Sequence, residues 1–202
     1  MRRFFSNKRG QYFITAAIII IVIIVSFVTV SNFSQRKDTT RLYDLGQELG
    51  IESQQVIDYG TYSQLDETQM KTLMESFIKT YADYIGNTGN LYFAYGNSKK
   101  IFTVAYMELV IEDACIKINP FGQSDDDHNA NVHCEPLEVT QLEAGTPNSQ
   151  EFPAASGQEI TRIEFDIEGV AYQFKLKEGE NFYFIIWQQI GEEKHVITSP
   201  QG

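Results

Sequence analysis

The chain has 202 residues, of which 43% are hydrophobic, 13% aromatic and 21% charged, enough for one ordinary globular domain with an appendage. This composition excludes a fully disordered protein. Asp and Glu number 27 against 16 Lys and Arg, so the net charge is -11. A protein that binds nucleic acid through phosphate contacts needs a basic surface, and we therefore exclude nucleic acid as a partner.

An uncharged apolar segment follows a basic amino end. Four basic residues lie within residues 1–10, whereas residues 11–35 hold no charged side chain. A lipid bilayer core is about 30 Å thick and is crossed by about 20 apolar residues in a helix. We therefore expect a transmembrane helix at residues 11–35 in the cell membrane, after a basic cytoplasmic leader at residues 1–10. The excess of positive charge before the segment places the N-terminus in the cytoplasm and the C-terminal part outside.

The junction between the two segments reads Lys8-Arg9-Gly10-Gln11. Together with the apolar residues that follow, it resembles the class III signal peptides of archaeal type IV pilin-like proteins. The resemblance covers the first part of the chain only, and it implies that a prepilin-like peptidase cuts after Gly10. The apolar helix is then retained as an anchor in the lipid bilayer and packs against other pilin-like subunits. Many pilins carry a glutamate where this chain has Thr15. An ordinary signal anchor is the alternative.

Residues 36–88 are expected to form a helical stalk and a second, amphipathic helix. Leucines and a valine recur at heptad-like spacing in the stalk, and the glycines there predict a break near Gly60. The second helix is expected from Asp66 to Tyr84. Its predicted apolar face comprises Met70, Leu73, Met74, Phe77, Tyr81 and Tyr84. We interpret this face as core that packs on a sheet, rather than as a ligand groove.

Residues 89–202 are expected to form an antiparallel β-rich extracytoplasmic domain. The expected strands are 91–95, 101–107, 109–118, 160–167, 170–176, 181–190 and 194–198. Several turns between successive strands are too short for a crossover helix, which favours antiparallel pairing. Residues 120–158 are rich in Gly, Pro and small polar residues and are expected to form a loop.

Cys115 and Cys134 are the two cysteines of the chain. In an extracytoplasmic compartment such a pair predicts a disulfide, worth about 3 kcal/mol on the chain-entropy model. A more specific alternative to the disulfide is a zinc site formed by these cysteines with His128 and His133, but the spacing of the four residues fits no usual zinc pattern. The acidic run at 125–127 lacks the alternation and glycine of a calcium loop. We therefore predict no metal and no cofactor.

Catalytic motifs are missing from the sequence. It contains no phosphate-binding glycine loop, no Gly-x-Ser-x-Gly and no His-Glu-x-x-His. Glu164, Asp166 and Glu168 alternate with apolar residues, which is typical of the solvated face of a strand. The aromatic residues around Trp187 are interpreted as buried strand residues rather than as a sugar or peptide platform. We therefore predict that the protein is not an enzyme.

The expected fold class is α+β, with a long N-terminal transmembrane helix, a second amphipathic helix and an antiparallel β-sheet ectodomain. The expected function is that of a membrane-anchored, pilin-like structural or adhesive surface protein, a subunit or accessory of a type IV pilus-like assembly. The alternative is a single-span membrane protein whose ectodomain binds a peptide, glycan or envelope partner without forming filaments.

Overall fold

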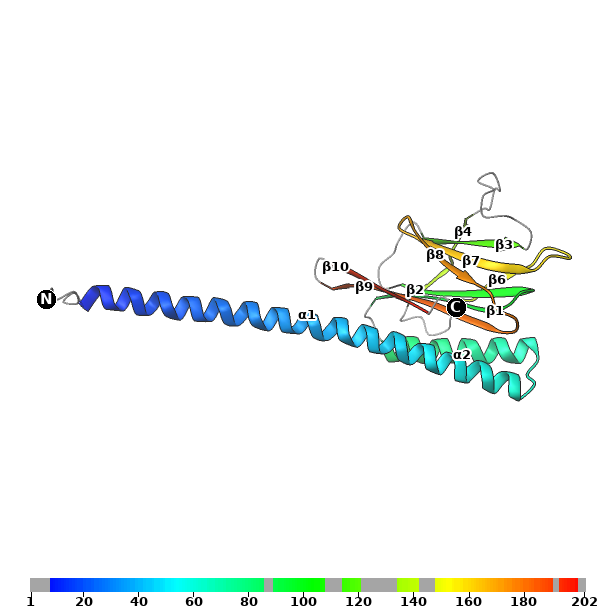
Figure 1. Cartoon of the computed structure of the whole chain (residues 1–202), viewed down its shortest axis with the longest axis horizontal. Coiled ribbons are helices and arrows are strands. Elements are labelled where there is room, and N and C mark those ends of the chain that lie inside the picture. The colour runs from blue at the N-terminus through cyan, green and yellow to red at the C-terminus, as the bar shows by residue number, and fades with distance from the viewer. Residues whose placement is uncertain are drawn as a thin grey trace. The chain divides into compact units, whose positions relative to one another are not determined.

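Figure 1 shows a computed structural model of the chain, which describes residues 8–85, 89–107, 114–120, 134–141, 148–190 and 193–199. Side chains at 8–15, 27–39, 119–120, 141 and 190 lie outside the description. The elements are α1 (Lys8–Tyr62), α2 (Glu67–Ile85), β1 (Asn90–Asn97), β2 (Lys100–Met107), β3 (Ala114–Pro120), β4 (Glu135–Pro136), β5 (Val139–Gln141), β6 (Gln150–Pro153), β7 (Ile160–Ile167), β8 (Val170–Lys175), β9 (Asn181–Ile190) and β10 (Glu193–Thr198). The chain divides into two compact units, Met1–Arg41 and Leu42–Gly202.

The first unit contains the amino-terminal part of α1. The transmembrane helix expected at residues 11–35 is contradicted, because no helix in the described part of the chain is long and apolar enough to cross a membrane. The predicted fold class is corrected accordingly.

The second unit has three layers: one layer of two helices and two layers of β-sheet (Figure 1). The C-terminal part of α1 and helix α2 cover one face of a six-stranded sheet with the order β10-β9-β1-β2-β5, in which β6 also pairs with β2. The other face of this sheet packs against a four-stranded sheet with the order β4-β3-β7-β8. The middle sheet is therefore covered on both sides.

The larger sheet is mixed, and the expectation of a purely antiparallel sheet is corrected. Strands β2 and β5 pair in parallel, with Ala105 opposite Val139, whereas the other described pairs are antiparallel. Parallel neighbours need a long crossover, and the connection from β2 to β5 provides one because it passes through β3 and β4. The stretch 120–158, expected as a loop, contains β4, β5 and β6.

The core of the second unit lies on both faces of strand β1, because side chains alternate along a strand. Leu91, Phe93 and Tyr95 contact the helices, whereas Tyr92 and Ala94 belong to the core shared with the smaller sheet. All five are at most 2% exposed. This double burial explains why the sequence of β1 is a continuous apolar run without the polar alternation of a half-exposed strand.

Helix α2 starts with a capping box. The Asp66 carboxylate accepts a hydrogen bond from the Gln69 amide at 2.8 Å, and the Gln69 side-chain carbonyl accepts one from the Asp66 amide at 3.1 Å. The predicted helix is confirmed to within one residue at each end. Tyr84, however, is 59% exposed rather than part of the apolar face. The buried face runs through Tyr81 and Ile85, and Tyr84 points about 100° away from Ile85.

The position at which α1 ends agrees with the sequence-based prediction. A break was expected near Gly60, and α1 ends at Tyr62, where the Leu65 amide donates a hydrogen bond to the Gly60 carbonyl at 3.1 Å. The predicted hairpin of β1 and β2, the hairpin of β7 and β8, and the pairing of β9 with β10 are all confirmed.

Candidate functional site

The predicted processing junction lies at the amino end of α1. Lys8, Arg9 and Gly10 are the first residues of the helix and Gln11 follows them. Their side chains lie outside the described part of the structure. Cleavage after Gly10 therefore stays a prediction.

The apolar segment of α1, defined here as Ala16–Val25, is the candidate assembly surface of the first unit. From Ile18 to Val25 each side chain exposes between 48% and 58% of its area. Successive residues of a helix point about 100° apart, so eight in a row cover every direction around the axis. Exposed apolar area costs about 25 cal/mol per Å² in water. A helix that is apolar all round is stable only when apolar groups of another molecule cover it.

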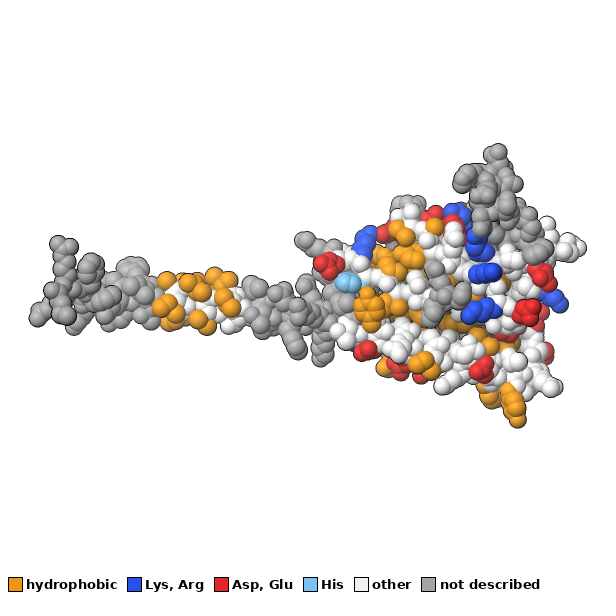
Figure 2. Space-filling view, in the orientation of Figure 1, with side chains coloured by type: hydrophobic (Ala, Val, Ile, Leu, Met, Phe, Trp, Pro, Cys, Tyr) orange, Lys and Arg blue, Asp and Glu red, His pale blue; other side chains and the backbone are white. Residues whose placement is uncertain are grey.

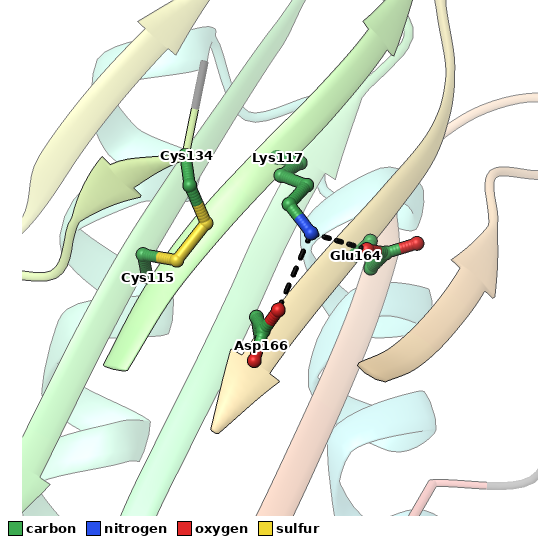
Figure 3. Close-up of a disulfide and its surroundings, with 5 residues drawn as sticks. All are labelled: Cys115, Lys117, Cys134, Glu164 and Asp166. Atoms are coloured by element: carbon green, nitrogen blue, oxygen red, sulfur yellow. Dashed lines mark hydrogen bonds and ion pairs between the residues drawn. A yellow bond between two sulfur atoms is a disulfide. The ribbon is translucent and has the colours of Figure 1, made fainter. Parts of the chain in front are cut away.

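The predicted disulfide between Cys115 and Cys134 is confirmed (Figure 3). Cys115 lies on β3 and Cys134 directly precedes β4, and their Cα atoms are 5.5 Å apart. Pro136 of β4 is the register partner of Cys115, so the disulfide holds together two segments that also pair as strands. The bridge therefore fixes the two ends of the connection between residues 115 and 134.

A half-buried ion-pair cluster lies beside the disulfide, on the outer face of the smaller sheet (Figure 3). The Lys117 ammonium is 2.9 Å from a carboxylate oxygen of Glu164 and 3.3 Å from one of Asp166. The exposed fractions of the three side chains are 29%, 14% and 28%. The amide of Gln173, on β8, donates to the second Glu164 oxygen at 2.7 Å. These contacts join the three neighbouring strands β3, β7 and β8.

The charges of this cluster favour a structural role. The hydrogen bond to Glu164 raises the pKa of Lys117 above its ordinary value, partial burial opposes that rise, and the bond to Asp166 adds to it. The amine therefore stays protonated at neutral pH and has no lone pair with which to act as a nucleophile. The sequence predicted a solvated face at Glu164 and Asp166 and missed their partner. The missing information was the register that sets Lys117 opposite Glu164.

The aromatic residues near the C-terminus are buried in the two cores. Phe182, Tyr183, Phe184 and Trp187 lie on β9 and are between 1% and 8% exposed. The hydroxyl of Tyr183 donates to the Lys175 carbonyl. These residues therefore form core, as the sequence predicted, rather than a platform for a sugar or a peptide.

Tyrosines also line the contact between the helices and the larger sheet. The hydroxyl of Tyr81, on α2, donates to the Leu45 carbonyl of α1 and so links the two helices. Burial raises the pKa of Tyr81, and the nearby carboxylates of Glu48 and Glu52 raise it further. Burial also raises the pKa of Tyr106, on β2, to about 12. These hydroxyls are neutral over the physiological pH range and do not serve as acids or bases there.

A cavity of about 190 Å³ lies between α1 and the start of β9. Polar residues line it, including Ser53, Asn181 and Ser199, which are each 5% exposed. The polar groups of these residues form hydrogen bonds with other groups of the protein. The Asn181 amide donates to the carbonyls of Lys177 and Gly179, both at 3.0 Å, and the Ser53 hydroxyl donates to Gly50. The cavity therefore offers few groups to a ligand.

Among the described residues, no three His, Cys, Asp or Glu side chains come together as a possible metal site. His128 and His133, which the zinc alternative requires, lie outside the described residues, as does the acidic run at 125–127. In the comparisons with known proteins, no family model, no curated protein and no solved structure matches this chain.

Proposed function

We propose that the protein is a pilin-like structural or adhesive subunit of the cell surface, which assembles by lateral packing of the apolar segment of α1. The observation that carries the proposal is the exposure of Ile18 to Val25 on every side of one helix. Copies of this segment can cover one another, because each is apolar all round and has the same length. The mechanism is association rather than catalysis.

The second unit supports a location outside the cytoplasm. A disulfide persists in oxidising compartments and is rare in the cytosol. The Cys115–Cys134 bridge therefore favours an extracytoplasmic second unit. A domain with two buried cores and a disulfide is suited to display at a cell surface, where chaperones are scarce and proteases are frequent.

The proposal includes processing of the amino end. A prepilin-like peptidase removes residues 1–10 by cutting between Gly10 and Gln11, which is the implication of the resemblance at the amino end. In the assembly, the apolar segments of neighbouring subunits cover one another. No cofactor takes part.

The test combines mass analysis with fractionation of cells that make the full chain and the peptidase. We expect mature protein that begins at Gln11 and sediments with sheared surface filaments. Ile21→Lys places a charge in the apolar segment, where the side chain is 58% exposed, and should abolish the filament fraction. Tyr84→Lys is the matched control, because Tyr84 is 59% exposed but lies on α2, and it should assemble normally. An intact Met1 together with normal assembly of Ile21→Lys would refute the proposal.

A further inference from the structure

The charges of α1 change sign along the helix. Residues 36–41 hold three basic residues, Arg36, Lys37 and Arg41, and one acidic residue, Asp38, whereas residues 42–62 hold four acidic residues and no Lys or Arg. These four, Asp44, Glu48, Glu52 and Asp58, are exposed, as is Arg41. In Figure 2 the helix side of the second unit, at the bottom of the view, shows acidic and hydrophobic side chains.

Most of these charges belong to one stripe of positions spaced alternately by four and three residues. We call it the charged α1 stripe, and it comprises Lys37, Arg41, Asp44, Glu48, Ile51, Gln55, Asp58 and Tyr62. Lys37 is placed by its position in α1 alone, and the members from Arg41 onward are all exposed. The leucines at 42, 45 and 49 lie on the other side of the helix, in the core. The spacing of the stripe is the one at which parallel helices meet in a coiled coil.

The charges of the stripe discriminate between the possible axial offsets of two parallel copies. Without an offset, each charged member meets the same residue of the other copy, so every contact between charges is repulsive. With an offset of seven residues, Lys37 of one copy lies beside Asp44 of the other, and Arg41 lies beside Glu48. The remaining stripe positions then bring no two charges together. An offset of fourteen loses both opposite pairs and sets Asp44 beside Asp58, and an offset of eleven keeps only Lys37 beside Glu48 within the stripe.

The charged residues of this part of α1 that lie outside the stripe are compatible with the offset of seven. Asp38 precedes Leu42 by four residues and Leu45 by seven, which places it on the side of the buried leucines. Arg36 and Glu52 flank the stripe. The offset sets Arg36 beside Tyr43, which is 61% exposed and whose ring attracts cations, and it sets Glu52 beside a tyrosine rather than beside another carboxylate.

We propose that neighbouring copies pack α1 beside α1 in parallel, with an offset of seven residues that the charged α1 stripe determines. The occupant of the stripe is a second copy, because the basic part of the stripe complements the acidic part of the same stripe one heptad further on. The contact also follows the apolar segment along the same helix, so it continues the packing between subunits. The inference rests on the proposed function, to which it adds the alignment of neighbouring copies.

The offset makes the contact one that can repeat. Asp44 and Glu48 of one copy, and Lys37 and Arg41 of the other, are left for further copies that add around a common axis with the same offset. A head-to-tail contact of this kind does not close and produces a filament. Exposed ion pairs contribute little free energy each. The stripe therefore selects the offset, while the apolar segments supply most of the affinity.

The first experiment reverses one charge of an intermolecular pair. Protein from cells that make the full chain and the peptidase is diluted out of detergent, and assembly is measured by sedimentation and negative-stain electron microscopy. We expect Glu48→Arg to raise the concentration needed for assembly by about threefold to tenfold, because an exposed attraction becomes a repulsion. Arg41→Glu should do the same. Arg41→Glu/Glu48→Arg should restore assembly, since opposite charges then meet again between copies.

Matched controls make the same changes of net charge outside α1. Glu178→Arg and Lys99→Glu alter exposed residues in the turns after β8 and β1, and both should assemble like the wild type. A 1:1 mixture of Arg41→Glu and Glu48→Arg is a further check, because alternating copies then present opposite charges, and it should assemble better than either variant alone. Circular dichroism of every variant establishes that the second unit remains folded.

The second experiment measures the offset directly. Gln55 and Tyr62 are exposed, uncharged members of the stripe that lie seven residues apart, and the native cysteines are already paired with each other. We expect Gln55→Cys mixed with Tyr62→Cys to form an intermolecular disulfide on mild oxidation, and each variant alone to form much less. Ile51→Cys mixed with Tyr62→Cys reports an offset of eleven residues and should also form less.

The outcomes separate this inference from the proposed function. If the wild-type protein does not assemble at all, both are wrong. If it assembles and Glu48→Arg behaves like the Glu178→Arg control, the inference is wrong while the proposed function stands. If Glu48→Arg and Arg41→Glu each weaken assembly but their combination does not restore it, the two residues have other partners and the inference is overturned. Preferred cross-linking of Gln55→Cys alone, or of Ile51→Cys with Tyr62→Cys, would overturn the offset of seven.

Discussion

Gly46 and Gly50 lie one turn apart on α1, and the structure predicts opposite effects when each is replaced by Ala. A β-carbon at Gly46 would lie 2.5 Å from Cγ2 of Ile197, on β10, whereas a β-carbon at Gly50 would have no atom within 4 Å. Ala gains about 1 kcal/mol over Gly inside a helix, and this gain applies at both positions. At Gly46 it is opposed by overpacking, which costs about 1–3 kcal/mol.

Gly50→Ala should therefore stabilise the protein by about 1 kcal/mol, and Gly46→Ala should be less stable than Gly50→Ala by about 1–3 kcal/mol. Urea unfolding of the full chain, followed by the fluorescence of the single Trp187, measures both. The second variant Ile197→Leu lacks the Cγ2 atom and should recover part of the loss in Gly46→Ala. Equal stabilisation by Gly46→Ala and Gly50→Ala would refute the close approach of α1 to β10.

Three further predictions concern the disulfide, the helix cap and a buried tyrosine. Replacing Cys115 and Cys134 by Ser should cost about 3 kcal/mol of unfolding free energy, and an unchanged urea midpoint would contradict the bridge. Asp66→Ala should cost about 1 kcal/mol through the lost cap, whereas Asp58→Ala, in the interior of α1, should cost less. The pKa of Tyr106 is about 12 against an ordinary 10.0, so its neutral form contributes stability that is complete below pH 10 and lost as the pH rises towards 12. Wild type should therefore lose about 2 kcal/mol relative to Tyr106→Phe over that range, and parallel pH profiles would refute this.

The elements that the sequence predicted are those with local determinants. The Asp66 cap, the end of α1 near Gly60 and the turn after β1 all depend on residues that are close in the chain. The disulfide was also predictable, because a chain with two cysteines has one possible pairing within it. Such features need no knowledge of how distant strands are arranged.

The features that the sequence did not predict depend on distant pairing. The parallel neighbour of β2 comes from a strand of three residues, too short to show a periodic pattern. The salt bridge of Lys117 depends on the register of β3 with β7, which are joined by a long connection. Alternation alone therefore placed Glu164 and Asp166 correctly on the outer face of the strand, but it did not predict their pairing with Lys117.

The apolar segment contributes free energy to an assembly but does not define how its copies are aligned. Burial of the apolar segment is favourable in many relative positions, because the hydrophobic effect has no direction and Ile18–Val25 is apolar on every side. Such packing supplies free energy without fixing how far one copy slides or turns against the next. The register between copies therefore has to come from polar or charged groups elsewhere in the chain, as it does in helical assemblies whose apolar seam tolerates several alignments.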